Sequence, residues 1–234
     1  MSKRQQQKKI KEQKQAAAKQ RDRAKKIGLK VFTFVITPAL LLFVFYTLFT
    51  QGPTYSPVEI SDSDHIRGTT ENSVTIVVYA DFQCPACATE HQTMTQLWPS
   101  IRDRALLIFR HYPITAQHPN SWTASLYAEA AARQNRFWEM HDYLFATQPI
   151  WASMNNVEGE FDSYALELNL DIDQLHEDIE SEEIISKIRN DQRGGNSAGV
   201  RSTPAVFING RLLTNPSRTR IIEAVNEEYE AASG

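Results

Sequence analysis

The chain is poor in cysteine and glycine for its length. Of its 234 residues, two are cysteine and nine are glycine. A small secreted fold held together by disulfides would need more cysteines at wider spacing, so the sequence excludes that class. The two cysteines, Cys84 and Cys87, stand three positions apart. Because a bridge that closes so short a loop adds little stability, we expect the pair to be reactive rather than structural.

A metal site is another use of a Cys-x-x-Cys pair, and the histidines do not favour it. A structural zinc site needs two further Cys or His ligands, usually at close spacing. His91 follows Cys87 by one helical turn, and His111 and His118 stand farther along the chain. These histidines form no second closely spaced pair, so the sequence predicts no metal site. An inert disulfide and a redox-inactive binding module remain open as alternatives.

Basic charge is concentrated at the N-terminus. Twelve of the 25 Lys and Arg residues lie among the first 30 positions, against two acidic residues there. Residues 1–27 are interpreted as a basic cytoplasmic tail rather than a nucleic-acid-binding segment, because an apolar run follows at residues 28–50 that carries no charge beyond Lys30. About twenty apolar residues suffice to cross a bilayer, and a basic flank stays on the cytoplasmic side. We therefore expect a single transmembrane anchor at 28–50 that is not cleaved, since the next residues lack a small-x-small signal-peptidase site.

Beyond the anchor, residues 51–72 are rich in Pro, Ser, Thr and acidic side chains, which predicts an extracytoplasmic linker whose last residues could already belong to the domain. Residues 73–234 are the predicted folded domain. Two continuous apolar runs, 73–82 and 105–114, are typical of strands covered on both faces. Helical periodicity fills residues 115–199, with a stop signal at Gly194-Gly195. A hairpin with an Asn209-Gly210 turn and a terminal helix complete the chain, so we predict an α/β domain with a helical insertion at about 115–199.

The Cys84-Pro85-Ala86-Cys87 motif lies at a predicted helix start. There the unpaired backbone N–H groups and the helix dipole favour a thiolate over a thiol. A thiolate is the nucleophile in disulfide exchange, and a low pKa also makes it a good leaving group. We assign Cys84 as the nucleophile and Cys87, one turn into the helix, as the thiol that resolves the mixed disulfide.

Three blocks of sequence together resemble the DsbA-like thiol–disulfide oxidoreductases. They read DFQCPAC, HPNSWTASLYAEAAARQNRFWEMHDYLF and GVRSTPAVFINGRLL. The resemblance covers about residues 64–232, with the blocks in the order of that family. The resemblance implies a thioredoxin-like fold with an inserted helical domain. It also implies a cis-proline loop facing the cysteines, matched here by Thr203-Pro204. Pro85, Ala86, Thr203 and Pro204 are therefore the predicted substrate-binding residues.

The basic flank before the anchor predicts that the domain lies outside the cytoplasm, on the periplasmic side of a bacterial membrane. We expect the Cys84–Cys87 disulfide to be donated to client proteins that carry cysteines, with no cofactor beyond that disulfide. A membrane partner of the DsbB or VKOR type would then reoxidise the pair. The alternatives are a reductase or isomerase kept reduced by a membrane electron donor, and a non-catalytic chaperone or assembly module.

Two positions depart from the family pattern. The strongest oxidants of the family carry a histidine where this chain has Ala86, so we expect a weaker oxidant with a Cys84 pKa of roughly 5–6.5. Many relatives carry an acid six positions before the first cysteine, where this chain has Val78. Asp81 is a possible substitute for that acid, although a solvated carboxylate at the strand end is the interpretation we favour.

Overall fold

The computed structural model describes residues 23, 25, 32–40, 42–43, 59–68 and 74–233. The chain divides into two compact units, Met1–Gly52 and Pro53–Gly234. In the first unit, Phe32–Ile36 forms the π-helical turn η1. Within the described residues, no helix has the length and apolar character that crossing a membrane requires. Most of the expected tail, anchor and linker (1–27, 28–50 and 51–72) falls outside the described residues.

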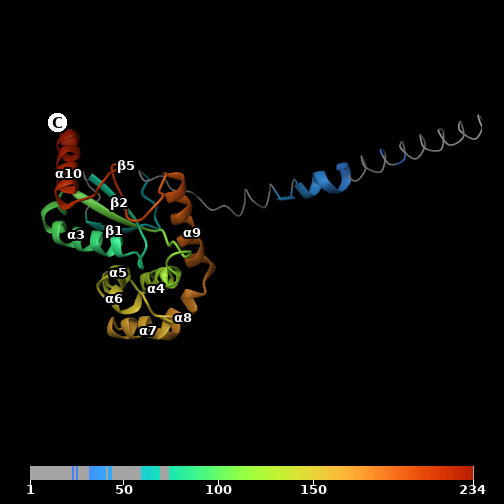
Figure 1. The fold of residues 1–234 in the computed structure, drawn as a ribbon, viewed down its shortest axis with the longest axis horizontal. Helices are drawn as coiled ribbons and strands as arrows, with labels where there is room; N and C mark the ends of the chain where they lie inside the picture. Colours follow the sequence, from blue (N-terminus) through green and yellow to red (C-terminus); the bar gives the residue numbers. More distant parts are fainter. Residues whose placement is uncertain are drawn as a thin grey trace, which may run out of the picture. The chain divides into compact units, whose positions relative to one another are not determined.

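The second unit is built on a five-stranded sheet with the order β1-β3-β2-β4-β5 (Figure 1). Strands β2 and β3 run parallel, and the other neighbouring strands run antiparallel. The strands are β1 (His65–Gly68), β2 (Val74–Ala80), β3 (Ala105–His111), β4 (Ala205–Ile208) and β5 (Arg211–Leu212). Strands β2 and β3 are the two apolar runs predicted from the sequence. The β4–β5 hairpin turns at Asn209 and Gly210, both with positive φ, as its Asn-Gly turn predicts.

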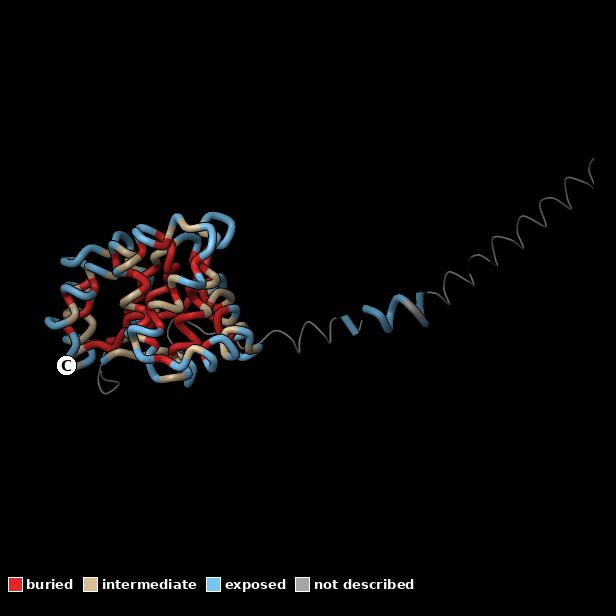
Figure 2. Tube along the Cα trace, turned by 90° about the horizontal axis from the view of Figure 1, so that it is seen from below, coloured by how far each residue is buried: buried red, intermediate tan, exposed pale blue. Residues whose placement is uncertain are grey.

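Both faces of the central strands are buried because helices cover both. Alternate residues of β2 enter two separate cores, Ile76 and Val78 in the larger and Val77 and Tyr79 in the smaller. Helix α3 (Pro85–Ile101) connects β2 to β3, and the terminal helix α10 (Arg218–Ser233) packs against it. Figure 2 shows the buried residues at the centre of this unit and the exposed ones around it. The start of α3, which carries the cysteine pair, is thereby held on a rigid sheet.

The predicted helical insertion lies between β3 and β4. Its helices group beyond one end of the sheet in Figure 1, and the last of them, α9, returns to pack on β3. They are α4 (Ser121–Arg133), α5 (Phe137–Ala146), α6 (Gln148–Trp151), α7 (Glu158–Glu167), α8 (Ile172–Ile179) and α9 (Glu182–Ser197). The α/β fold with an inserted helical domain is confirmed.

Two details of the sequence interpretation were wrong. Helix α9 continues through Gly194 and Gly195 and ends at Ser197, followed by Gly199 at φ +85°. The glycine at 195 serves close packing, because a Cβ there would lie 2.8 Å from the ring of Tyr112. The folded unit also begins before residue 73, since β1 lies in the expected linker and pairs with β3. A polar segment can form such a strand where it covers a sheet edge.

Candidate functional site

The cysteine pair lies at the N-terminus of α3, as predicted. Cys84 is the N-cap residue with extended backbone angles (φ −75°, ψ 121°), and Pro85 follows at the first helical turn. The Cys84 side chain is at the surface boundary, with the residue 8% exposed, whereas Cys87 is 0% exposed. Pro85 and Ala86 are exposed between them. Cys84 thus lies nearer the surface than Cys87.

The predicted proline loop lies beside Cys84. The Thr203–Pro204 peptide bond is cis, which confirms the expectation for this loop. In the reduced pair, the Cys84 thiol can donate to the Thr203 carbonyl oxygen at 3.6 Å. The structure thus brings the predicted site residues together from two segments about 120 positions apart. Their role in client binding stays a prediction.

The two sulfurs differ sharply in acidity. The pKa of Cys84 is lowered to about 5, chiefly by the hydrogen bond from the Cys87 thiol. The side chain of Thr203 and the backbone N–H groups of Cys87 and Ala86 lower this pKa further. This value meets the lower end of the expected range. Burial raises the pKa of Cys87 far above its ordinary value, and the hydrogen bond to Cys84 adds to the rise. Near neutral pH the reduced pair is therefore a Cys84 thiolate beside a Cys87 thiol.

Asp81 organises the loop that precedes α3. The favoured interpretation of a solvated carboxylate was wrong, because Asp81 is 0% exposed. Its Oδ1 accepts from the Gln83 N–H at 2.8 Å, and its Oδ2 accepts from the Ile114 N–H and faces His118 Nδ1, both at 2.8 Å. Its own N–H points to Cys87 Sγ at 3.5 Å. Both carboxylate oxygens are engaged in holding the loop.

Two glutamines that the sequence analysis did not single out join the cysteine loop to the helical insertion. Buried Gln148 of α6 donates to the carbonyl oxygens of Phe82 (2.6 Å) and Cys84 (3.0 Å). Gln83 donates to the Ala152 carbonyl at 2.6 Å and accepts from the Asn120 N–H. The DFQCPAC block contains Gln83, but its partners lie some 37 to 69 positions away. These bonds fix the backbone that carries the nucleophile.

A small cavity lies under α3, farther along the helix than Cys87. Its volume is about 20 Å³, and Val78, Ala80 and Glu90 are among its lining residues. Glu90 is 7% exposed, and burial raises its pKa to about 8. Its Oε1 is buried and has no hydrogen-bond partner within the described part of the chain. Sequence reasoning missed this acid, because a single Glu in a helix gives no periodic signal.

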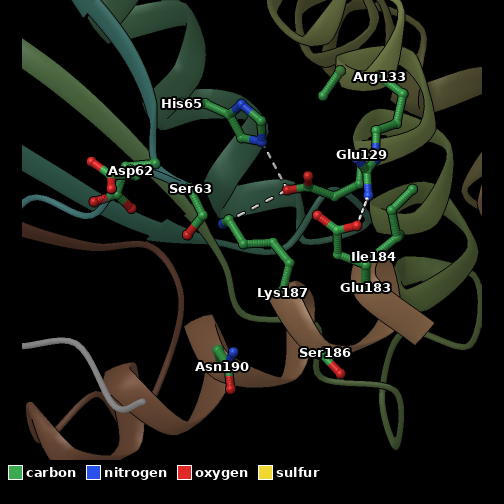
Figure 3. Close-up of a pocket in the computed structure, with 12 residues that line it drawn as sticks. Asp62, Ser63, His65, Glu129, Arg133, Glu183, Ile184, Ser186, Lys187 and Asn190 are labelled. Carbon is green, nitrogen blue, oxygen red and sulfur yellow. Dashed lines mark hydrogen bonds and ion pairs between the residues drawn. The ribbon is translucent and has the colours of Figure 1, made fainter. Parts of the chain in front are cut away.

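A larger pocket of about 380 Å³ lies between the segment before β1 and helices α4 and α9 (Figure 3). At its base the Glu129 Oε1 atom lies 2.9 Å from His65 Nε2 and 3.7 Å from Lys187 Nζ, and it also meets buried His111 at 2.7 Å. The Lys187 ammonium already supplies a cation beside this carboxylate. None of the pocket's lining residues belongs to the cysteine site. We interpret these charged side chains as a structural contact that joins the sheet to the helical insertion.

A family model described as thioredoxin matches residues 61–227. The chain belongs to the thioredoxin family. Among the curated relatives of this thioredoxin-family chain are Na(+)/H(+) antiporter NhaA 3 of Salinispora tropica, 36% identical over 166 residues, and Na(+)/H(+) antiporter NhaA of Herminiimonas arsenicoxydans, 32% identical over 164 residues. Each match covers 70% of this chain but only 24% and 25% of the respective relative. The chain thus spans about a quarter of the length of these relatives.

Solved structures share the fold. The Wolbachia pipientis protein alpha-DsbA1 superposes with a TM-score of 0.68 at 20% identity, covering 76% of this chain and 98% of that one. BdbD from Bacillus subtilis gives 0.67 at 19% identity, covering 76% and 100%. A thioredoxin-like oxidoreductase from Silicibacter pomeroyi gives 0.63 at 23% identity, covering 73% and 94%. The thioredoxin-like fold with a helical insertion is therefore shared over nearly the full length of these neighbours.

Proposed function

We propose that the chain is a thiol–disulfide oxidoreductase that donates the Cys84–Cys87 disulfide to client proteins. The observation that carries the proposal is the contrast between the two sulfurs. Cys84 is 8% exposed with a lowered pKa, whereas Cys87 is 0% exposed with a raised one. A low pKa makes Cys84 the better leaving group when a client's second thiolate attacks the mixed disulfide. The pair itself carries the two electrons, so no further cofactor enters the proposal.

Client binding is assigned to the surface around Cys84. Pro85 and Ala86 are exposed beside the nucleophile, and the carbonyl oxygen of Thr203, which precedes Pro204, lies 3.6 Å from the Cys84 sulfur. An extended client segment could pair with the Thr203 backbone as an added strand. Fold neighbours such as MdbA of Corynebacterium diphtheriae, a thiol-disulfide oxidoreductase, support the reaction class.

The proposal also includes a location. We place the domain on the extracytoplasmic side of a bacterial membrane, anchored through residues 28–50 with the basic residues 1–27 in the cytoplasm. The support is the basic flank and uncharged run of the sequence. The large apolar side chains described in the first unit, such as Phe34 at 77% exposure, are also exposed there. A quinone-linked membrane protein of the DsbB or VKOR type would reoxidise the pair.

Two experiments test the activity and its direction. The purified protein should oxidise a reduced two-cysteine peptide with one equivalent of disulfide, and Cys84→Ala should abolish this reaction. A chaperone or assembly module would instead keep its client binding and show no transfer. Thiol trapping in cells should find the pair mostly oxidised; a mostly reduced pair would favour the reductase or isomerase alternative.

A further inference from the structure

In any disulfide exchange, the buried sulfur of Cys87 must gain or lose a proton. When a client thiolate attacks Cys84, the leaving group is a thiolate on Cys87, which is 0% exposed. Burial strongly disfavours that charge. A proton must therefore reach Cys87 as the disulfide opens and must leave when Cys87 attacks in the reverse direction. Asp81 is nearby, but both of its carboxylate oxygens are engaged in holding the loop.

Glu90 is a second buried acid, on the same buried face of α3 as Cys87. Cys87, Glu90, Met94, Leu97 and Ile101 form the buried face of α3. Residues three apart on one helix face have Cβ atoms about 5–6 Å apart. Helix side chains also lean toward the N-terminus, and Cys87 lies on the N-terminal side of Glu90. Its Oε1 has no hydrogen-bond partner among the described residues, although most buried polar atoms have one.

Glu90 borders the same cavity as Val78, the β2 position at which many relatives carry an acid. Glu90 and Val78 line the same cavity of about 20 Å³, a volume that roughly one water can fill. We propose that Glu90 is the proton-exchange group for Cys87, supplying from helix α3 the carboxyl that strand β2 lacks at Val78. This inference rests on the proposed thiol–disulfide exchange and assigns one further residue to it.

The protonation of the surrounding groups suits this role. Burial raises the Glu90 pKa to about 8, so its carboxyl holds a proton at neutral pH. The other titratable groups lining the cavity are His91 and His141, whose pKa values are lowered by burial, to about 4 for His141. Both imidazoles are therefore neutral near pH 7. Asp142 lies beyond them, 2.8 Å from His141 Nδ1 and paired with Arg67. Glu90 is thus the group of this cavity that can give up a proton near neutral pH.

The proposed step balances. The client thiolate forms a bond to Cys84 Sγ while the Cys84–Cys87 bond breaks, and the electron pair of that bond goes to Cys87. Glu90 then transfers its proton to Cys87, which gives a thiol and a Glu90 carboxylate. The carboxylate regains a proton from solvent. In reverse, the Glu90 carboxylate removes the proton of Cys87 as that sulfur attacks the mixed disulfide.

The test measures two successive releases of a coloured thiol in one reaction. Reduced protein is mixed with an aromatic disulfide whose thiol product is coloured. Attack by Cys84 releases a first equivalent, and attack by Cys87 on the resulting mixed disulfide releases a second. In Glu90→Gln the first release should keep its rate, while the second should slow by about 10²-fold, the scale of general acid–base catalysis. The wild-type rate of the second release should rise with pH through about 8, and this rise should be absent from the variant.

The control is Glu177→Gln, which makes the same substitution at an exposed helix position and should change neither release. An unchanged second release in Glu90→Gln would overturn the proposal. Equal slowing of both releases would also overturn it, because general packing damage at α3 would then explain the effect. Absence of the first release from wild-type protein would refute the proposed function itself, and with it this role for Glu90.

Discussion

At the scale of single residues, one helical turn separates two very different sulfurs. Cys84 at the helix start accepts hydrogen bonds from Cys87 and from backbone N–H groups, while Cys87 lies in the apolar core. Ala86 contributes to the Cys84 site through its backbone only, since a methyl side chain has nothing to donate. The residue between the cysteines should therefore be able to change the stability of the thiolate.

Replacing Ala86 with histidine tests this contribution. An imidazolium beside Cys84 should lower its pKa below about 5 and make the disulfide more oxidising, because both quantities report stabilisation of the thiolate. One pKa unit corresponds to roughly 30 mV for a two-electron couple. Thiolate absorbance against pH and a glutathione equilibrium titration measure the two shifts. As a control, Gln92→His at an exposed position farther along α3 should leave the Cys84 pKa and the potential unchanged. If Ala86→His also leaves both unchanged, the hypothesis is wrong.

The buried Glu90 carboxyl should also make stability depend on pH. Its pKa is raised from 4.5 to about 8 by burial, so the folded chain keeps a proton that the unfolded chain releases near its ordinary pKa. The free energy of unfolding should therefore decrease as pH rises from about 4.5 to 8 and level off above, by an amount on the order of a few kcal/mol. Urea unfolding of Glu90→Gln across this range should lack that decrease. A parallel pH dependence in both proteins would contradict the raised pKa.

At the scale of elements, helix α9 shows how packing overrides a local signal. The sequence interpretation ended this helix at the pair Gly194-Gly195. The helix instead continues through both glycines, because this face of α9 lies directly on two tyrosine rings. A Cβ on Gly195 would meet Tyr112 at 2.8 Å and Tyr79 at 3.0 Å. The close approach of α9 to the sheet, rather than the end of the helix, accounts for glycine at this position.

Two glycine-to-alanine changes separate these effects. Gly195→Ala should destabilise the protein by about 1–3 kcal/mol, the usual cost of overpacking a core. Gly159→Ala in α7, where nothing lies within 4 Å of the new Cβ, should leave stability unchanged or slightly higher because alanine favours helix. Thermal or urea unfolding measures both. If Gly195→Ala is as stable as Gly159→Ala, the approach of α9 to Tyr112 is looser than described.

At the scale of the whole domain, a buried ion pair attaches the segment before β1 to the sheet. Arg110 of β3 binds both carboxylate oxygens of Asp64, at 2.9 and 2.8 Å, and both side chains are fully buried. Arg110 also donates to the Glu59 carbonyl and to the Tyr79 hydroxyl. Residues 59–68 are therefore part of the folded domain.

Removing one partner of this pair should be costly. Asp64→Ala leaves the buried Arg110 without its carboxylate, which typically destabilises a protein by about 3–5 kcal/mol. Asp103→Ala breaks the exposed Arg102–Asp103 pair and should leave stability nearly unchanged, since exposed ion pairs contribute little. Denaturant unfolding of both variants provides the comparison. Similar stabilities would mean that residues 59–68 are not held by this contact.

The sequence by itself determined the features that depend on local pattern. Apolar runs identified β2 and β3, an Asn-Gly pair identified the hairpin, and Cys-Pro-Ala-Cys at a helix start predicted a lowered pKa for Cys84. These signals are readable because hydrophobic periodicity, turn chemistry and the helix terminus act over a few neighbouring residues.

Only the tertiary structure decided which distant groups meet. It engaged both carboxylate oxygens of Asp81, joined Gln148 to the cysteine loop, buried Glu90 without a partner for Oε1, and attached residues 59–68 to the sheet through Arg110. Whether a carboxyl is solvated, paired or protonated depends on its burial and on the donors around it. Those donors come from segments tens of residues away, so their positions are set by the packing of the sheet and the insertion.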